Sequence, residues 1–121
     1  MINYNIKGTG FDITDELRTY VEKKLGNASK LLEGDSTAHA DVELQYLPDG
    51  RSGKYRAEFT VTGAHRLWRA EAWGALCHEA IDVATDELSR EITTDKKKHK
   101  DIVRRGAARA KEFFRGWRRK V

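Results

Sequence analysis

Apolar and polar residues alternate in four short stretches of the chain, and this period of two predicts four β-strands. The first stretch covers residues 2–6, and the others cover residues 40–46, 55–61 and 68–72. Clusters of Gly, Pro, Asp and Ser separate them, as expected for turns. Since each strand has one apolar face and one polar face, we expect helices to cover a single side of the sheet.

Two further stretches carry apolar residues at helical spacing. Thr14 is suited to cap the first helix, because its hydroxyl can accept from a free backbone N–H and two acidic residues follow it. The apolar pattern then continues to about Leu32, and a second one runs from Ala75 through Ile92. The order β-α-β-β-β-α predicts an α+β fold, with a four-stranded sheet and two helices on one face.

The last segment, residues 101–121, predicts a third helix that is basic and contains aromatic residues. We therefore divide the chain into an α+β domain, residues 1–100, and this tail. Gly106 and Gly116 weaken the predicted helix, so we hypothesise that it becomes ordered on its target. The residues expected to share its apolar face are Val103, Ala107, Ala110, Phe114 and Trp117.

Charge is separated along the chain. Residues 1–93 carry 11 Lys and Arg against 16 Asp and Glu, whereas residues 94–121 carry 12 against 3. The two parts have net charges of −5 and +9 within a total of +4, and such a separation attracts a polyanion. The candidate cations for binding phosphates are Lys23, Lys24 and Lys30 in the first helix, then Lys96, Lys97, Lys98, Lys100, Arg104, Arg105 and Arg109.

Aromatic residues are interleaved with the cations of the tail, namely Phe113, Phe114 and Trp117. Aromatic rings and guanidinium planes stack on unpaired bases, so this composition favours RNA as the polyanion. Two other targets remain open from the residues alone. A basic amphipathic helix also suits an anionic membrane surface or an acidic protein, and the tail aromatics can instead pack on the domain itself.

Catalytic and metal chemistry is not expected. The four histidines lie far apart without metal-binding spacing, and Cys77 falls on the apolar stripe of the second helix. Gly8-Thr9-Gly10 lacks the lysine and hydroxyl that complete a phosphate-binding loop. We therefore expect a protein without enzymatic activity, cofactor, metal or small-molecule substrate.

The compartment expected from the sequence is the cytoplasm. A single cysteine excludes an internal disulfide and fits a reducing environment. No apolar run reaches the roughly 18 residues that span a bilayer, and the N-terminus lacks the pattern of a signal peptide.

Blocks of residues along the first hundred positions resemble one known family in order and spacing. These blocks are Ile6-Lys7-Gly8, Ile13-Thr14, residues 17–25, Tyr55-Arg56-Ala57-Glu58-Phe59-Thr60-Val61, Arg69-Ala70-Glu71-Ala72, Ala80-Ile81-Asp82 and Leu88-Ser89-Arg90. The chain is similar to the short-form ribosome hibernation-promoting factor / ribosome-associated inhibitor A family, also called sigma-54 modulation proteins.

This resemblance implies a fold like that of double-stranded-RNA-binding domains and a partner, the small ribosomal subunit. The family binds 16S rRNA between head and body, over the decoding region, and occupies space needed by mRNA and tRNA. The expected function is reversible inhibition of translation under stress, by a protein that is monomeric when free. On matching positions, the family's rRNA-binding residues are Lys23, Lys24, Arg90, Lys96, Lys97, Lys98 and Lys100.

The chain departs from the family pattern at two places. Its second helix is acidic, with five carboxylates between residues 79 and 91, so we hypothesise that the basic tail supplies the affinity which that helix has lost. Lys24 falls close to the apolar stripe and is expected to reach between the helices. The tail is also too short to be the separate domain that long-form members carry. A general structured-RNA-binding module and a modulator of a sigma factor remain as alternative functions.

Overall fold

The computed structural model describes residues 2–50, 53–64 and 66–119; in the last range it describes side chains up to residue 100 and from 104 to 106. The elements are β1 (Asn3–Thr9), α1 (Asp15–Ser29), the 3-10 turn η1 (Lys30–Leu32), β2 (His39–Tyr46), β3 (Tyr55–Thr62), β4 (Leu67–Gly74) and α2 (Cys77–Arg119). The predicted order of strands and helices is confirmed.

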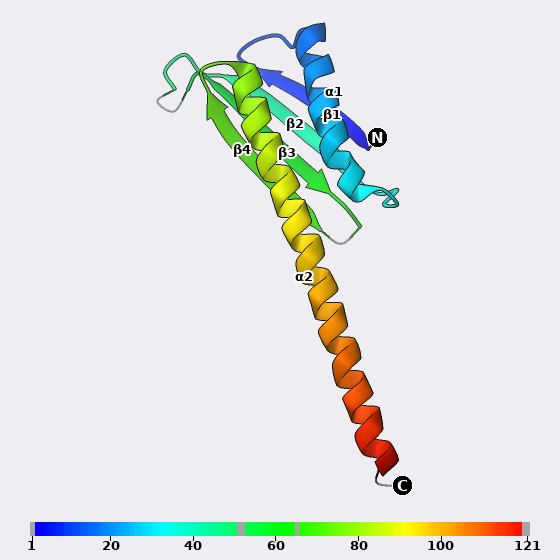
Figure 1. The fold of residues 1–121 in the computed structure, drawn as a ribbon. Coiled ribbons are helices and arrows are strands. Elements are labelled where there is room, and N and C mark those ends of the chain that lie inside the picture. The colour runs from blue at the N-terminus through cyan, green and yellow to red at the C-terminus, as the bar shows by residue number, and fades with distance from the viewer. Residues whose placement is uncertain (1, 51–52, 65, 120–121) are drawn as a thin grey trace.

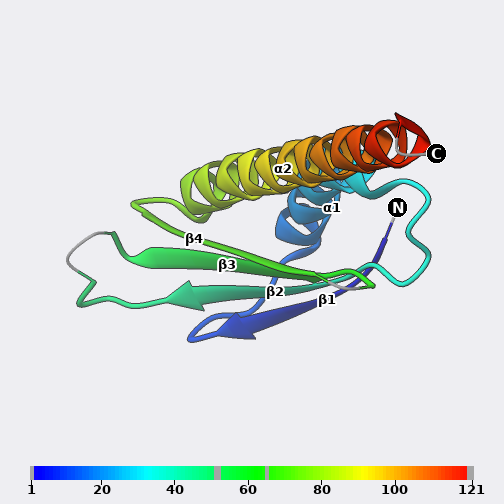
Figure 2. The same cartoon turned by 90° about the horizontal axis from the view of Figure 1, so that it is seen from below.

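The sheet follows the chain order, β1-β2-β3-β4. β1 is parallel to β2, and the other neighbours are antiparallel. The α1 crossover between β1 and β2 makes the parallel pair possible, because parallel strands need a long connection. Both helices lie on the same face of the sheet (Figure 2), so the predicted two-layer α+β arrangement is confirmed.

The core fills the space between the sheet and the two helices. Its largest fully buried side chains include Phe59 from β3, Leu44 from β2, Leu25 from α1, and Ile81 and Leu88 from α2. In the sheet register Phe59 lies opposite Val42 and Ala70. A large ring between small neighbours lets the helices approach the strands closely.

The connection from β1 into α1 follows from local chemistry. Gly10 has φ +84°, and an added Cβ would lie 2.6 Å from the carbonyl oxygen of Tyr46, so glycine is required there. Thr14 Oγ1 then accepts from the backbone N–H of Leu17 at 3.1 Å, which confirms the predicted cap. At its far end the α-helix stops at Ser29 and tightens into η1.

α2 differs from the prediction at both ends. It starts at Cys77, two residues after the predicted start, and it runs without a break to Arg119 (Figure 1). Residues 101–119 are thus helical, but they continue α2 and do not form the separate third helix that the sequence predicts. Residues 93–100 contain neither Gly nor Pro, and Gly106 costs only about 1 kcal/mol, which does not end a helix flanked by Lys, Arg and Ala.

Because α2 is continuous, its last part projects beyond the sheet. The buried stripe on this helix reaches Ile92, whereas Lys96, Lys97, Lys98, Lys100 and the described side chains of residues 104–106 are exposed. At 1.5 Å per residue, residues 96–119 extend roughly 36 Å from the body of the domain (Figure 1). We call residues 96–119 the arm.

We predict that the two leucines Leu88 and Leu67 respond differently to truncation. Leu88 is fully buried and Leu67 is 62% exposed. Leu88→Ala should lower the free energy of unfolding by about 2–5 kcal/mol, whereas Leu67→Ala should change it by less than about 0.5 kcal/mol. Urea denaturation monitored by circular dichroism measures both, and equal losses would contradict this packing.

Candidate nucleic-acid interface

The exposed charges on α2 change sign along its length. Glu79, Asp86 and Glu87 are exposed on the half that covers the sheet, and the run from Lys96 to Lys100 begins where the helix leaves it. Successive helical residues are rotated by about 100°, so Lys96, Lys97 and Lys98 point in different directions. The base of the arm therefore presents positive charge around most of its circumference, which suits a phosphate backbone on several sides.

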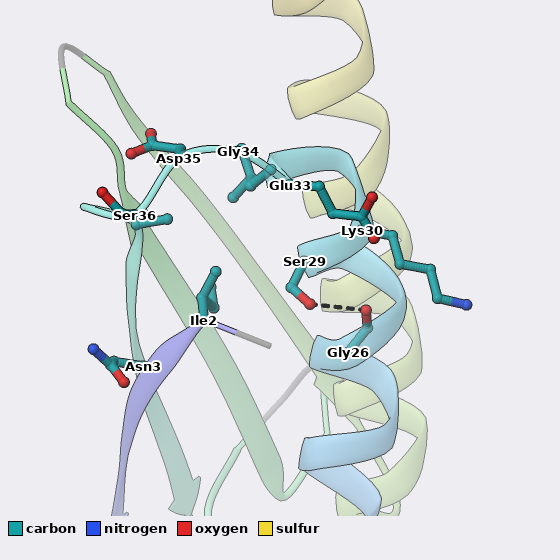
Figure 3. Close-up of a pocket in the computed structure, with 11 residues that line it drawn as sticks. Ile2, Asn3, Gly26, Ser29, Lys30, Glu33, Gly34, Asp35 and Ser36 are labelled. Atoms are coloured by element: carbon teal, nitrogen blue, oxygen red, sulfur yellow. Dashed lines mark hydrogen bonds between the residues drawn. The ribbon is translucent and has the colours of Figure 1, made fainter.

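Two of the three cations predicted for the first helix are exposed. Lys23 lies on α1 and Lys30 follows seven residues later at the start of η1, which directly continues α1, so the two residues lie on nearly the same side. Figure 3 shows the Lys30 side chain extending away from the pocket at the end of this helix, toward solvent. These two lysines are placed to add phosphate contacts beside the arm.

Lys24 lies between the helices, as expected. Its Nζ is 3.2 Å from Oδ1 of Asp82 on α2 and 5.6 Å from the centre of the Tyr20 ring. The Tyr20 hydroxyl donates to the same carboxylate. The hydrogen bond from Tyr20, followed by that from Lys24, lowers the pKa of Asp82, and the bond to Asp82 raises the pKa of Lys24. Lys24 is thus engaged in holding α1 against α2.

A second polar contact joins the same two helices. His78 Nε2 lies 2.9 Å from Oε1 of Glu16, and the His78 ring packs edge-on against Tyr20 with centroids 4.6 Å apart. The pair His78 and Asp82, one turn apart on α2, therefore contacts α1. Within the described part of the chain no group of three His, Cys, Asp or Glu could hold a metal ion.

Arg90 lies on another side of α2 from the contacts with α1. It lines a cavity of about 500 Å³ beside β4 together with Lys98, Glu87 and Glu91. The two carboxylates reduce the positive potential around Arg90. Arg90 and Lys98 therefore lie beside β4, whereas Lys23 and Lys30 lie on α1 and η1. The side chain of Arg109 lies outside the described residues, as do those of Phe113, Phe114 and Trp117.

Among the residues that the structure describes, those on the open face of the sheet form no comparable positive surface. Arg56 on β3 donates to Glu58 and, at 2.8 Å, to Glu71, and Arg69 donates to Glu58 at 2.6 Å. Glu43 lies 3.6 Å from Arg56 as well. The bond to Glu71 raises the pKa of Arg56, and the same bond lowers the pKa of Glu71. Since these two arginines are already paired with carboxylates, we expect phosphate groups to bind on the side of the domain that carries the helices.

The cavity at the end of α1 also lacks a converging set of cations among the residues that line it. It measures about 510 Å³ and lies between the start of β1, the end of α1 and the loop after η1 (Figure 3). Its polar contacts are internal, such as the bond of 2.9 Å from Ser29 Oγ to the carbonyl oxygen of Gly26. Cys77 offers no nucleophile, because burial raises the pKa of its thiol to about 11. None of the helices in the described part of the chain combines the length and apolar content of a membrane span.

Comparison with known proteins identifies the family. The profile of the family described as Sigma 54 modulation protein / S30EA ribosomal protein matches residues 4–100. The chain belongs to this family. The ribosome hibernation promotion factor of Bacillus subtilis is 32% identical over 104 residues, covering 86% of this chain and 51% of that protein. The ribosome hibernation promotion factor of Lactococcus lactis is 29% identical over 117 residues, covering 93% of this chain and 62% of that protein.

The family assignment confirms the resemblance seen in the sequence, although the chain spans only 51% and 62% of the length of these two relatives. Among solved structures, the N-terminal domain of Thermus thermophilus Protein Y is 35% identical with a TM-score of 0.64, covering 76% of this chain and 96% of that one. A ribosomal subunit interface protein from Coxiella burnetii, 18% identical, has the same fold with a TM-score of 0.68, covering 79% and 99%. The matched segment ends at residue 100, so most of the arm lies beyond it.

One group of residues that meets where the arm leaves the domain was not predicted from the sequence. Trp68 within β4 and Arg66 just before it both contact Asp95 of α2, and His99 lies one turn further along. Asp95 is half-buried and His99 is exposed, but they follow the buried Ile92 at spacings of three and seven residues. This periodicity could have indicated that the two polar side chains face the sheet.

We predict that neutralising Asp82 destabilises the domain in a pH-dependent way. Because its pKa is lowered in the folded chain, the carboxylate stabilises the fold above its ordinary pKa, and this contribution is lost as the pH falls through the folded value. Since the side chain is 43% exposed, Asp82→Asn should cost only about 1 kcal/mol at pH 7.

Urea denaturation of both proteins at pH 7 and near pH 3 measures the effect. The difference between them should shrink below pH of about 4, where the carboxyl of the unfolded chain is protonated. Glu87→Gln, which removes an exposed carboxylate from the same helix, is the control and should change stability little at either pH. A pH-independent loss for Asp82→Asn would contradict the ion pair with Lys24.

Proposed function

We propose that this chain is a ribosome hibernation factor that binds rRNA of the small subunit through the arm, Lys23 of α1 and Lys30 of η1. The main support for this proposal is that α2 is one continuous helix. Its acidic half packs on the sheet, and its basic half projects from the domain. The names of the relatives support the ribosome as the target. The proposal places the chain in the cytoplasm, as a monomer when free of ribosomes.

The charge distribution orients the chain as it approaches rRNA. A charge of +9 over residues 94–121 attracts rRNA, while the net charge of −5 on residues 1–93 is repelled by it. At physiological ionic strength exposed charges are screened beyond about 8 Å, so the acidic half of α2 does not cancel the field at the far end of the arm. The arm therefore contacts RNA first and orients the domain.

Occupancy alone accounts for inhibition. In the proposed complex the domain lies near the decoding region, with its helical side on rRNA, and blocks the paths of mRNA and tRNA. No covalent step is involved, so inhibition ends when the protein dissociates. Affinity arises from many phosphate contacts, each of which releases counterions, and it therefore falls steeply as salt rises.

The deciding experiment is sedimentation of the purified chain with separated small and large ribosomal subunits over a range of salt concentrations. Saturable pelleting with the small subunit, weakening as salt rises, supports the proposal. Equal binding to both subunits and to duplex RNA would indicate a general RNA-binding module. Binding to a sigma factor without binding to either subunit would favour the transcriptional alternative.

We predict that neutralising two cations of the arm flattens the salt dependence of ribosome binding. For Arg104→Ala combined with Arg105→Ala, the slope of log K against log salt should fall by up to about 2, since each lost phosphate contact removes roughly 0.7–0.9. Lys7→Ala is the control, because Lys7 is exposed on the open face of the sheet. An equal change in the control would contradict a role specific to the arm.

A further inference from the structure

A cleft opens where the arm leaves the domain. Two cavities of about 370 Å³ and 400 Å³ adjoin there and share Asp35, Arg66, Trp68 and His99. They lie between the loop after η1, the turn from β3 to β4, and α2. We call them together the arm-base cleft. Their volumes fall within the roughly 300–1,000 Å³ range of small-molecule sites.

The cleft has an apolar floor and a basic rim. Trp68 and Leu32 are only 7% and 5% exposed and form the floor. Lys96 and Lys100 are exposed and four residues apart, so both stand on one side of α2 above that floor, next to His99. Glu33, also exposed, lies on the opposite rim. An apolar surface next to a pair of ammonium groups suits a flat ring that carries a phosphate.

The walls of the cleft are fixed to one another by hydrogen bonds. Asp95 Oδ2 accepts from Trp68 Nε1 at 2.7 Å and lies 3.6 Å from Arg66 Nη1, which also donates to the Asp95 carbonyl oxygen at 3.4 Å. Across the cleft, Asp35 Oδ2 accepts from the backbone N–H of Ala64 at 3.3 Å. Since three separate chain segments are tied together, a ligand would meet a formed site and lose less entropy on binding.

We propose that the arm-base cleft binds a single nucleoside phosphate, with its base on the floor formed by Trp68 and Leu32 and its phosphate at Lys96 and Lys100. His99 lies next to these two lysines on α2 and can donate to a phosphate oxygen. The Glu33 carboxylate can accept from an amino group of the base, such as that of guanine. The nucleotide is either an unpaired residue of RNA or a free mononucleotide, and the first source rests on the proposed function.

The test uses the Trp68 indole N–H as its reporter. Guanosine 5′-monophosphate is titrated into the ¹⁵N-labelled full chain, with guanosine and inorganic phosphate as separate fragments. We expect saturable shifts of the Trp68 indole signal and of amides in residues 96–100, strongest with the complete nucleotide. A short single-stranded oligonucleotide, titrated in parallel, separates the two sources. The same shifts indicate RNA, whereas shifts with the mononucleotide alone indicate a free nucleotide.

Matched variants show whether the cleft itself binds the nucleotide. Lys96→Ala combined with Lys100→Ala should weaken binding of guanosine 5′-monophosphate about tenfold, because charge-assisted contacts to phosphate are lost. Lys98→Ala combined with Lys97→Ala removes the same charge from α2, and neither residue lines the two cavities. This control should bind within about twofold of the unchanged chain. An unchanged Trp68 indole signal in the ligand-free variants shows that the cleft is intact.

Three results would contradict the proposal that the cleft binds a nucleotide. The first is no shift of the Trp68 indole signal with guanosine 5′-monophosphate or with the oligonucleotide. The others are an equal loss of affinity in the control variant and the same shifts with inorganic phosphate alone. The sedimentation experiment distinguishes this failure from failure of the proposed function. If the unchanged chain still pellets with the small subunit, only the proposed nucleotide binding by the cleft is wrong. If it does not pellet, the proposed function is wrong, whatever the cleft binds.

Discussion

The apolar stripe on the first half of α2 is the constraint on which the rest of the molecule depends. Ile81, Leu88 and Ile92 are fully buried against the sheet and fix the direction of the helix. Because the backbone continues as one helix to Arg119, the same packing also sets where the basic half points. A break near residue 95 would leave the same charges without a defined direction. The position of the positive surface is thus a consequence of core packing.

Internal ion pairs then decide which cations remain for a partner. Lys24 is engaged with Asp82 between the helices, and Arg56 and Arg69 are matched by carboxylates on the sheet. Each such pair contributes little stability on its own, yet together they leave the sheet face close to neutral. Positive charge is therefore concentrated on the arm, which the body of the domain does not cover.

The family match and the charge pattern describe different parts of the chain. Residues 4–100 carry the shared fold, and the densest positive charge continues past residue 100. The carboxylates on the packed half of α2 make that half acidic, whereas the cations lie further along the same helix. The arm-base cleft lies at the junction, where Asp95 ties the end of the packed helix to β4.

The order of the elements, the buried faces and the cap at Thr14 could be predicted from the sequence, because periodicity and capping are local properties. The sequence also located the basic segment and the family resemblance. It did not determine the length of α2, since a glycine at position 106 weakens a helix without ending it, and only the backbone as a whole shows which effect prevails. Nor did it reveal the hydrogen bond from Trp68 to Asp95 or the cleft that Trp68 and His99 line together. Trp68 is far from both residues in the chain, and it comes close to them only because α2 packs across β4.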